Sequence, residues 1–391
     1  MEPAGPSHRR PRVSDLCLIV AFFSLLWLPT LDSLFHLDHA PTPNEKRLLN
    51  TFPKWSAPGV SPKAYLGGIE AWFNDRFGFR KRLVRLHSKW KRDLFKDSSL
   101  ADVIVGRDGW LFYGGGRMID NHRGTSLFST NDLRAWQELL EARRDWLARR
   151  GIRYLFVVAP NKESIYPEQL PEWLATPGPT RKLDQFIHHM RAHSTVEVLD
   201  LRPALLAAKR DARTYLLTDS HWNALGAFAG YQAVVRAISR QWPGLEPLPL
   251  EAFGQSIEDT DGGDLADMLG QERMLKERGV IRLDPKPPLQ PLEVLDDTAL
   301  DSGTVTRERR LRFTKQPGQR YRVMLFRDSF ASAWQKLLGQ NFSRVLYVWQ
   351  QHWSVPLVER ERPDMVVDEM LERYFNERDP RELRREDALP P

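Results

Sequence analysis

Cysteine is almost absent from this chain of 391 residues, and its rarity restricts the chemistry that the protein can use. The single cysteine, Cys17, excludes an intramolecular disulfide and any metal site built from several thiolates. The chain also lacks zinc-finger spacing, an RNP motif, a long basic helix and an internal repeat, so nucleic acid is not an expected partner. We expect neither a metal ion nor another cofactor.

A large excess of charge of one sign is absent too. The formal net charge is +6 and the isoelectric point is about 9.4, but basic and acidic residues are interspersed. Such a balance permits attraction to an anionic polymer or to lipid headgroups without requiring it. Apolar residues make up 41% of the chain and charged residues 28%, which is typical of a globular protein rather than a disordered one.

Long hydrophobic runs are limited to one, near the N-terminus. It covers Leu16–Leu31 and follows a basic stretch within residues 9–12. As a helix the run reaches about 24 Å, short of a hydrocarbon core of about 30 Å, and extension to Phe35 closes much of that gap. We therefore expect a cytoplasmic tail at 1–14 and an uncleaved signal anchor at 15–35, which is one transmembrane helix in the inner membrane with the catalytic domain in the periplasm. A cleaved signal peptide is the alternative, although no A-x-A site follows the run.

The remainder of the chain divides into a linker, a folded region and a tail. Residues 36–62 form a Pro-rich linker, and Ser61–Phe95 reads as a helical region with aromatic and basic side chains. We expect one catalytic domain at 63–375, interrupted at 254–318 by a long insertion rich in Asp, Gly and Pro. The charged tail at 376–391 is expected to fray.

The folded region shows alternating strand and helix patterns. We predict strands at Tyr154–Ala159, Val196–Leu199, Tyr321–Phe326, Arg344–Val348 and Met365–Asp368. We predict helices at Asp132–Arg150, Arg181–Ala192, Ala224–Trp242 and Phe330–Leu338. Alternation of this kind predicts an α/β fold with a mostly parallel sheet that helices cover on both faces.

The strongest local signal for chemistry is Ser329, which stands between a predicted strand and a predicted helix. In an open parallel sheet, reactive groups belong at the carboxyl ends of the strands. A serine at a helix N-terminus has backbone N–H groups near it that can stabilise an oxyanion. Its hydroxyl is a weak nucleophile, so it needs a base, and the base needs an acid that orients it.

The segment Asp219-Ser220-His221 offers that base and that acid. Residues two apart in extended backbone point to the same side, so Asp219 and His221 can project together. Asp219 is then able to hold one imidazole nitrogen while the other takes the proton of Ser329. The alternative for Asp219 is a helix N-cap, a role for which Ser220 and Asn223 compete. We predict a triad of Ser329, His221 and Asp219.

Four further residues are candidates for binding substrate. Asn161, Lys162 and Tyr166 follow a predicted strand closely enough to line the site, but they also fit a turn between two prolines. Trp222, next to the predicted base, is able either to stack on a sugar ring or to anchor the following helix. Both alternatives stay open for each of the four.

Six ordered segments of the chain resemble the AlgJ/AlgX type of alginate O-acetyltransferases, which are SGNH-hydrolase-like proteins. The similar segments are Gly106–Tyr113, Ala159–Pro171, Asp219–Asn223, Gly262–Gly270, Phe326–Phe330 and Arg362–Tyr374. The family's catalytic Asp and His fall on Asp219 and His221, and its nucleophile falls on Ser329. Arg327 stands where related nucleophile motifs often have glycine. The AlgJ type is the closer one, because few residues follow Tyr374, too few for the carbohydrate-binding module of the AlgX branch.

The resemblance implies a flavodoxin-like three-layer fold and a two-step reaction. Ser329 would take an acetyl group as an acyl-enzyme, and His221 would then activate a hydroxyl of an extracellular polysaccharide, alginate or similar, to receive it. The acetyl donor would be a membrane-bound O-acyltransferase partner. Two alternatives remain: a polysaccharide acetylesterase with the same triad, and a non-catalytic polysaccharide-binding subunit of an acetylation complex.

Overall fold

A computed structural model describes residues 22–24, 27–28, 31–32, 52, 62–76, 102–287, 289, 292–296, 311–350 and 353–387. The chain forms two compact units. One comprises Met1–Asp97 with Asp267–Gln271, and the other comprises Ser98–Ala266 with Glu272–Pro391. The first unit contains helix α2 (Pro62–Arg76). The rest of the expected helical region, from Phe77 to Phe95, lies outside the described residues.

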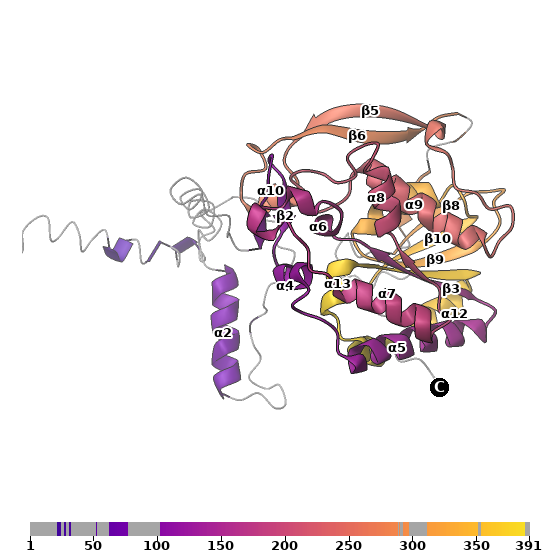
Figure 1. The fold of residues 1–391 in the computed structure, drawn as a ribbon, viewed down its shortest axis with the longest axis horizontal. Coiled ribbons are helices and arrows are strands. Elements are labelled where there is room, and N and C mark those ends of the chain that lie inside the picture. The colour runs from indigo at the N-terminus through magenta and orange to yellow at the C-terminus, as the bar shows by residue number, and fades with distance from the viewer. Residues whose placement is uncertain are drawn as a thin grey trace, which may run out of the picture. The chain divides into compact units, whose positions relative to one another are not determined.

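A seven-stranded mixed sheet forms the centre of the second unit (Figure 1). Its strands lie in the order β4 (Val198–Asp200), β3 (Arg153–Ala159), β11 (Met365–Leu371), β9 (Arg322–Arg327), β10 (Arg344–Trp349), β8 (Arg312–Lys315) and β7 (Leu295–Asp296). The first five run parallel, and β8 and β7 add an antiparallel edge beside β10. The prediction of a mostly parallel sheet is confirmed, and the five predicted strands each coincide with an observed one to within three residues at either end.

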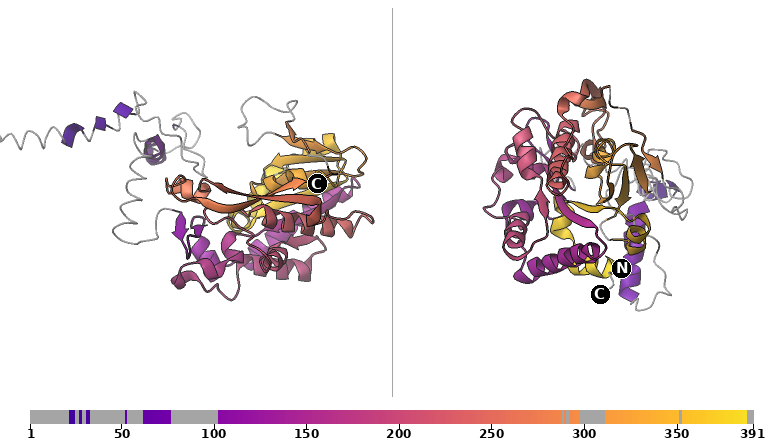
Figure 2. Two further views of the ribbon diagram at one scale, coloured as in Figure 1. Left: turned by 90° about the horizontal axis from the view of Figure 1, so that it is seen from above. Right: turned by 90° about the vertical axis from the view of Figure 1, so that its right-hand side faces the viewer.

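Helices cover both faces of this sheet and make three layers (Figures 1 and 2). Alternate side chains of β3 face opposite sides, so Leu155 and Val157 belong to one buried core, and Phe156 and Val158 to the other. The first core includes side chains of α8 (Arg202–Ala208), α9 (Ala224–Ser239) and α11 (Gln335–Leu338). The second includes side chains of α5 (Thr130–Ala148), α7 (Lys182–His193) and α12 (Val355–Glu361). Burial on both faces explains why the strands read as continuous apolar runs.

Side-chain caps fix where the two long helices begin. The Ser129 side chain accepts the backbone N–H of Asp132, and the Asp132 carboxylate accepts that of Ser129, which completes a capping box at the start of α5. The Asn223 side chain accepts the Gly226 N–H at 3.0 Å and caps α9. Asn223 therefore takes the capping role that the sequence also allowed for Asp219.

The shorter elements surround these layers. They are β1 (Val103–Val105), β2 (Leu111–Tyr113), α4 (Met118–Arg123), α6 (Lys162–Ile165), η1 (Pro167–Gln169), η2 (Glu172–Leu174), η3 (Leu250–Ala252), η6 (Phe330–Trp334) and α13 (Glu372–Glu377). The region expected as an insertion, 254–318, holds most of the antiparallel ribbon of β5 (Phe253–Thr260) and β6 (Glu277–Pro285), with α10 (Asp264–Met268) between its strands. The same region supplies β7 and β8 to the main sheet.

The C-terminal segment does not fray as expected. Residues Pro380–Asp387 form helix α14, and Asp387 is buried. Its carboxylate accepts Arg143 Nε at 2.8 Å and the backbone N–H of Trp353 at 2.7 Å, and Arg143 also pairs with Asp368. These contacts attach helix α14 to the rest of the domain. They explain why this charged segment is ordered although its composition predicts fraying.

The expected membrane anchor is not supported. In the part of the N-terminal run that the structure describes, residues 22–24, 27–28 and 31–32 are helical. Across the described residues, no helix combines the length and the apolar character that crossing a membrane requires. The apolar run is itself shorter than a hydrocarbon core and is followed at once by Asp32. The prediction of a single-pass inner-membrane protein with a periplasmic catalytic domain is therefore wrong.

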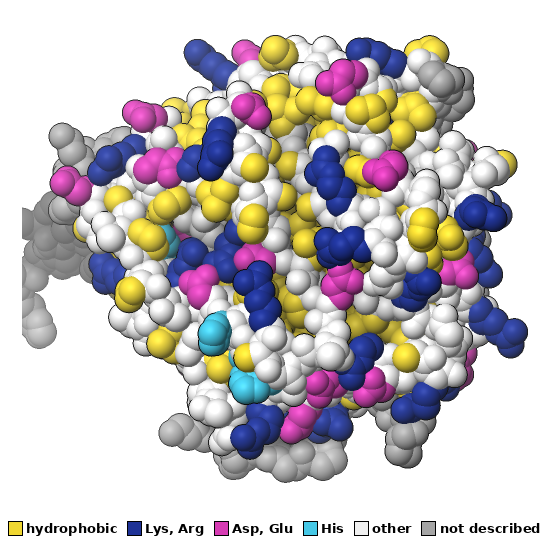
Figure 3. All heavy atoms as spheres, turned by 45° about the vertical axis from the view of Figure 1, so that its right-hand side comes forward, with side chains coloured by type: hydrophobic (Ala, Val, Ile, Leu, Met, Phe, Trp, Pro, Cys, Tyr) yellow, Lys and Arg dark blue, Asp and Glu magenta, His cyan; other side chains and the backbone are white. Residues whose placement is uncertain are grey.

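The surface shows the interspersed charge that the sequence suggested. On the face drawn in Figure 3, basic and acidic side chains lie among one another, with apolar side chains between them. This face therefore carries no broad patch of one charge.

Candidate active site

Ser329 lies at the carboxyl edge of the parallel strands, directly after β9 and Asp328 and just before η6. Asp328 fixes this segment, because its carboxylate accepts the N–H of Phe330 at 2.9 Å and that of Leu371, at the end of β11, at 2.8 Å. Burial raises the pKa of Asp328. The nucleophile candidate is thus held by contacts to the neighbouring central strand as well as by its own strand.

Arg327, the departure from the family pattern, has a fully buried side chain. Its guanidinium donates to the Asp328 carbonyl at 2.9 Å and to Ser332 Oγ at 2.7 Å, and it lies over the ring of Trp349. Burial lowers its pKa to about 10. Arg327 therefore braces the turn around Ser329 through side-chain contacts, where a glycine would offer none.

The structure brings together the three side chains that the sequence selected. His221 Nε2 lies 2.8 Å from Ser329 Oγ, and His221 Nδ1 lies 2.7 Å from Asp219 Oδ1. Asp219 Oδ1 also accepts the backbone N–H of His221 at 2.9 Å, which forms an Asx turn within the bend at residues 217–221 in place of the expected extended segment. With Nδ1 held by the carboxylate, Nε2 is oriented to take a proton from the serine.

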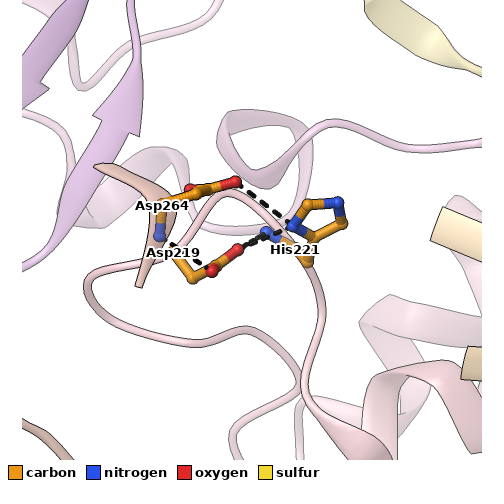
Figure 4. A group of neighbouring side chains, drawn as sticks. All are labelled: Asp219, His221 and Asp264. Carbon is orange, nitrogen blue, oxygen red and sulfur yellow. Dashed lines mark hydrogen bonds and ion pairs between the residues drawn. The ribbon is translucent and has the colours of Figure 1, made fainter. Parts of the chain in front are cut away.

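A second carboxylate, from Asp264 in α10, approaches the same imidazole (Figure 4). Asp264 Oδ2 lies 3.3 Å from His221 Nδ1. The other ring nitrogen of His221 points away from both carboxylates. Sequence analysis placed Asp264 in a family-like segment but gave it no role. Two consecutive glycines before an aspartate, Gly262-Gly263-Asp264, were the available signal that a carboxylate approaches another backbone closely.

The two carboxylates control the protonation of His221. Burial lowers the pKa of the imidazole, but hydrogen bonds and charge from Asp219 and Asp264 outweigh burial and raise it to about 9. Burial raises the pKa of Asp219, and the hydrogen bond to His221 more than reverses that, so the pKa of Asp219 is lowered. His221 is therefore an imidazolium at pH 7 in the resting site, and Asp219 is ionised.

Ligand atoms of Asp219, His221 and Asp264 all lie within 4.8 Å of one another, a spacing that also suits a metal ion. A metal ion on His221 Nδ1 would have to replace the proton that the two carboxylates accept. The hydrogen bonds among these groups account for the cluster without an ion. The absence of a metal ion from the working protein stays a prediction.

Lys162 holds the loop that carries Asp219 and His221. Its Nζ donates to the carbonyl oxygens of Leu111, Leu217 and Asp219 at 2.7, 2.8 and 3.0 Å. Burial lowers its pKa to about 7, and the three acceptors match the three N–H groups of the ammonium form. With those donors engaged, Lys162 has a structural role in place of the expected contact with substrate.

Trp222 and Tyr166 are also internal supports. The Trp222 ring is buried against Phe330 and Trp334, and its N–H donates to the Phe330 carbonyl at 3.2 Å. Tyr166 is buried, and its hydroxyl accepts the backbone N–H of Thr214 at 2.8 Å. Neither ring has an open face for a sugar, so the expected substrate contacts of these two residues are corrected to core packing.

Asn161 does line a pocket, which opens beside Ser220 and Phe330. The pocket is lined by Tyr113, Gly115, Gly116, Met118, Asn121, Asn161, Lys162, Glu163, Ser220, Phe330 and Arg373. Asn161 spans part of this wall, donating from Nδ2 to Glu163 at 2.8 Å and accepting the Arg373 N–H at 3.1 Å. Amides, a carboxyl group and a guanidinium thus surround a small polar space, which is lined by Phe330 but not by Ser329 or His221.

Comparison with other proteins gives a family for the segment that carries Asp219, His221 and Asp264, and Ser329 lies outside the matched residues. Residues 103–297 match the family described as SGNH hydrolase-like domain, acetyltransferase AlgX. The chain is 26% identical over 252 residues to a probable alginate O-acetylase AlgJ of Pseudomonas syringae pv. tomato, which covers 64% of this chain and 59% of that protein. The corresponding Pseudomonas aeruginosa protein is 26% identical over 244 residues, covering 59% of this chain and 57% of that protein. The chain thus spans less than two thirds of the length of these relatives.

Two solved structures share the fold at low sequence identity. Bacillus cereus PatB1 superposes with a TM-score of 0.54 and 15% identity, covering 71% of this chain and 98% of that one. A DHHW family protein from Eubacterium siraeum superposes with a TM-score of 0.52 and 14% identity, covering 74% and 96%. The fold and the matched segment confirm the resemblance that the sequence motifs suggested. We conclude that residues 103–297 of this chain belong to the SGNH hydrolase-like domain family of acetyltransferase AlgX.

Proposed function

We propose that this protein transfers acetyl groups to hydroxyls of a polysaccharide, alginate or a similar polymer, through an acetyl ester on Ser329. The contact that carries the proposal is the 2.8 Å distance between His221 Nε2 and Ser329 Oγ, with Nδ1 held by Asp219. Relatives that match the chain in part are named probable alginate O-acetylases, which supports the substrate class.

The first step forms the acyl-enzyme. Ser329 Oγ attacks the acetyl carbonyl carbon while neutral His221 takes the hydroxyl proton at Nε2, and Asp219 stabilises the imidazolium that results. When the tetrahedral intermediate collapses, the bond to the donor's leaving group breaks, and His221 returns the proton to that group. Ser329 now carries the acetyl ester, and the base is neutral again.

The second step passes the acetyl group to the acceptor. A sugar hydroxyl attacks the ester carbonyl and gives its proton to His221, after which the bond to Ser329 Oγ breaks and the serine recovers a proton. The names of the relatives, probable alginate O-acetylases, support a polysaccharide hydroxyl as the acceptor. If water took the place of the sugar, the same residues would act as an acetylesterase.

A membrane-bound O-acyltransferase remains the proposed donor of the acetyl group. Co-purification of such an enzyme with tagged protein, together with acetyl transfer to Ser329 in the isolated complex, would support it. Efficient transfer to Ser329 from a soluble acetyl ester alone, with no gain from that partner, would contradict it.

A serine-directed sulfonyl fluoride tests the central claim. A structure of PatB1 carries a sulfonyl adduct, so a protein with this fold accepts such a reagent. We expect one adduct on the wild type by intact-mass measurement and none on Ser329→Ala. Ser239→Ala is the control, because this serine ends α9 and its partly exposed hydroxyl donates to the Arg236 carbonyl oxygen at 3.0 Å.

Acetyl transfer is then followed from p-nitrophenyl acetate to polymannuronate oligosaccharides. The wild type and Ser239→Ala should produce acetylated oligosaccharides, whereas Ser329→Ala and Asp219→Ala should not. Acetate release without any acetylated oligosaccharide would favour an esterase. Equal labelling of the wild type and Ser329→Ala would contradict both the acetyltransferase and the acetylesterase, because both require Ser329 as the nucleophile.

A further inference from the structure

Asp264 makes several hydrogen bonds to the loop that carries Asp219 and His221. Its Oδ1 accepts the backbone N–H of Ser220 at 2.8 Å, and its Oδ2 accepts the Ser220 hydroxyl at 2.8 Å. In the opposite direction, its own N–H donates to Asp219 Oδ2 at 3.0 Å. Asp264 is thus hydrogen-bonded to Ser220 and to Asp219, and its carboxylate also lies beside the imidazole of His221.

Two glycines allow this approach. A Cβ built on Gly263 would lie 2.3 Å from Asp219 Cβ and 2.8 Å from its Cα, so a side chain there would push the two segments apart. A Cβ on Gly262 would meet the Leu275 carbonyl oxygen at 2.2 Å. The Gly263 N–H donates to Thr218 Oγ1 at 3.0 Å, which attaches the glycine segment to the start of the same loop. The segment is therefore fitted against the loop by shape as well as by charge.

Three described aspartates interact with His221, and the interaction with the buried Asp328 is electrostatic. Asp219 and Asp264 are the two carboxylates that hydrogen-bond the ring, and Asp328 lies in the segment before Ser329. Glu277 of β6 is occupied by the Thr218 hydroxyl at 2.6 Å, and Lys162 of α6 by the loop carbonyls. The two carboxylates that contact Nδ1 therefore come from the loop and from α10.

We propose that Asp264 is a positioning residue for His221, which holds the Nδ1 proton jointly with Asp219 and sets the pH range in which His221 acts as a base. The proposal rests on the proposed function for its meaning in catalysis. The titration of the His221 imidazole is measurable whether or not the protein transfers acetyl groups.

The variant Asp264→Asn tests the charge, because asparagine keeps an oxygen for the Ser220 N–H but carries no negative charge. The titration of His221 is read by NMR of ¹⁵N-histidine-labelled protein, assigned with His221→Ala. In parallel, the rate of Ser329 modification by the sulfonyl fluoride is measured from pH 6 to pH 10. Ser220→Ala is the matched control, since it removes one contact of Asp264 and leaves its charge.

We expect Asp264→Asn to lower the midpoint of the His221 titration by about one pH unit, while Ser220→Ala leaves it in place. Since one unit is a tenfold change in the neutral fraction, the ratio of mutant to wild-type labelling rates should be about tenfold higher at pH 7 than at pH 10. A residue with a merely structural role would reduce the rate by one factor at every pH. If Asp264→Asn does not fold, Gly263→Ala, which displaces the segment but keeps the charge, should lower the midpoint in the same direction.

An unchanged midpoint in the folded variant would overturn the proposal. So would a wild-type midpoint that moves when EDTA is added, because it would mean that a cation occupies the three ligand atoms. If no pH gives an adduct on wild-type Ser329 but the histidine midpoint still falls in Asp264→Asn, the proposed function fails and the role of Asp264 in the titration stands.

Discussion

Two of the clusters that the described residues form, each made of one basic group and two aspartates, differ in what they do. In the first, Arg143 of α5 is fully buried between Asp368 of β11 and Asp387 of α14. In the second, His221 lies between Asp219 and Asp264, and its side chain is 27% exposed. The first joins three elements on one face of the sheet, and the second lies at the carboxyl edge of the strands.

The difference shows how a buried charge becomes structural or reactive. Burial opposes the charge of Arg143, but its two aspartates outweigh burial and raise its pKa further, so the guanidinium stays charged at any physiological pH. The imidazole of His221, with a pKa of about 9, loses its proton within an accessible range. Arg143 also donates from all three of its nitrogens to the two aspartates, whereas His221 keeps one nitrogen for Ser329. An ion pair that cannot titrate holds elements together, and one that can titrate is available for proton transfer.

Removing the imidazole of His221 should have the largest effect on the rate of Ser329 modification. In His221→Ala the serine loses its base, and we expect the rate of Ser329 modification to fall by at least about a thousandfold, in line with losses of triad members in other hydrolases. The adduct is quantified by intact mass over time. His188→Ala, which removes an exposed histidine on α7, is the control and should keep the wild-type rate. A His221→Ala rate within tenfold of wild type would remove His221 from the mechanism.

Removing the permanent charge should affect stability and leave the chemistry intact. Arg143→Met leaves two buried carboxylates without a cation, and we expect the free energy of unfolding to fall by about 3–5 kcal/mol. Urea denaturation followed by tryptophan fluorescence measures this change. The neighbouring variant Arg144→Met breaks a partly exposed ion pair with Asp145 and should cost less than about 1 kcal/mol. A reduced labelling rate in folded Arg143→Met would contradict the separation between the two clusters.

The third prediction concerns the pH dependence of the labelling rate. Because the imidazolium cannot accept a proton, the labelling rate should rise about tenfold per pH unit from pH 6 and level off above a midpoint near 9. At pH 7 the rate should then be about one hundredth of the plateau. The same raised pKa stabilises the folded protein fully below the ordinary histidine value of 6.5, and this contribution disappears as the pH rises through 9. A midpoint near 6.5 would mean that the two aspartates do not act on His221 as the geometry requires.

Much of the fold and the core of the site could be predicted from the sequence, because both depend on local patterns. Continuous apolar runs identified β3, β9 and β10, since strands buried on both faces have no polar side to alternate with. Ser329 was found because it follows such a run, and Asp219 with His221 because residues two apart share one side of an extended segment. Each of these inferences used a few neighbouring residues and general rules of sheet geometry.

What could not be predicted depends on contacts between distant parts of the chain. Asp264 lies 43 residues after His221, as the two residue numbers show, in a region whose mixed composition gives no periodic pattern. Arg143 has no visible partner in its own helix, so the charged segment near Asp387 was read as a fraying tail. Trp222 and Tyr166 were candidates for sugar binding because an aromatic residue near a reactive group looks the same in sequence whether it is exposed or packed.

The position of β11 has a consequence for how the protein is made. This strand follows all the other strands of the sheet in the chain, yet it lies between β3 and β9, and it pairs with the whole of β3 and with residues 323–326 of β9. Before residues 365–371 leave the ribosome, the nascent chain contains two groups of strands, β4 with β3 and β9 with β10. No strand yet connects these two groups. Because domains generally fold as units during synthesis, the serine segment and Leu371 can meet only after translation of this last strand. A chain truncated before Met365 should therefore fold incompletely and be digested readily by proteases, and the segment that carries Ser329 should lack its contact with Leu371.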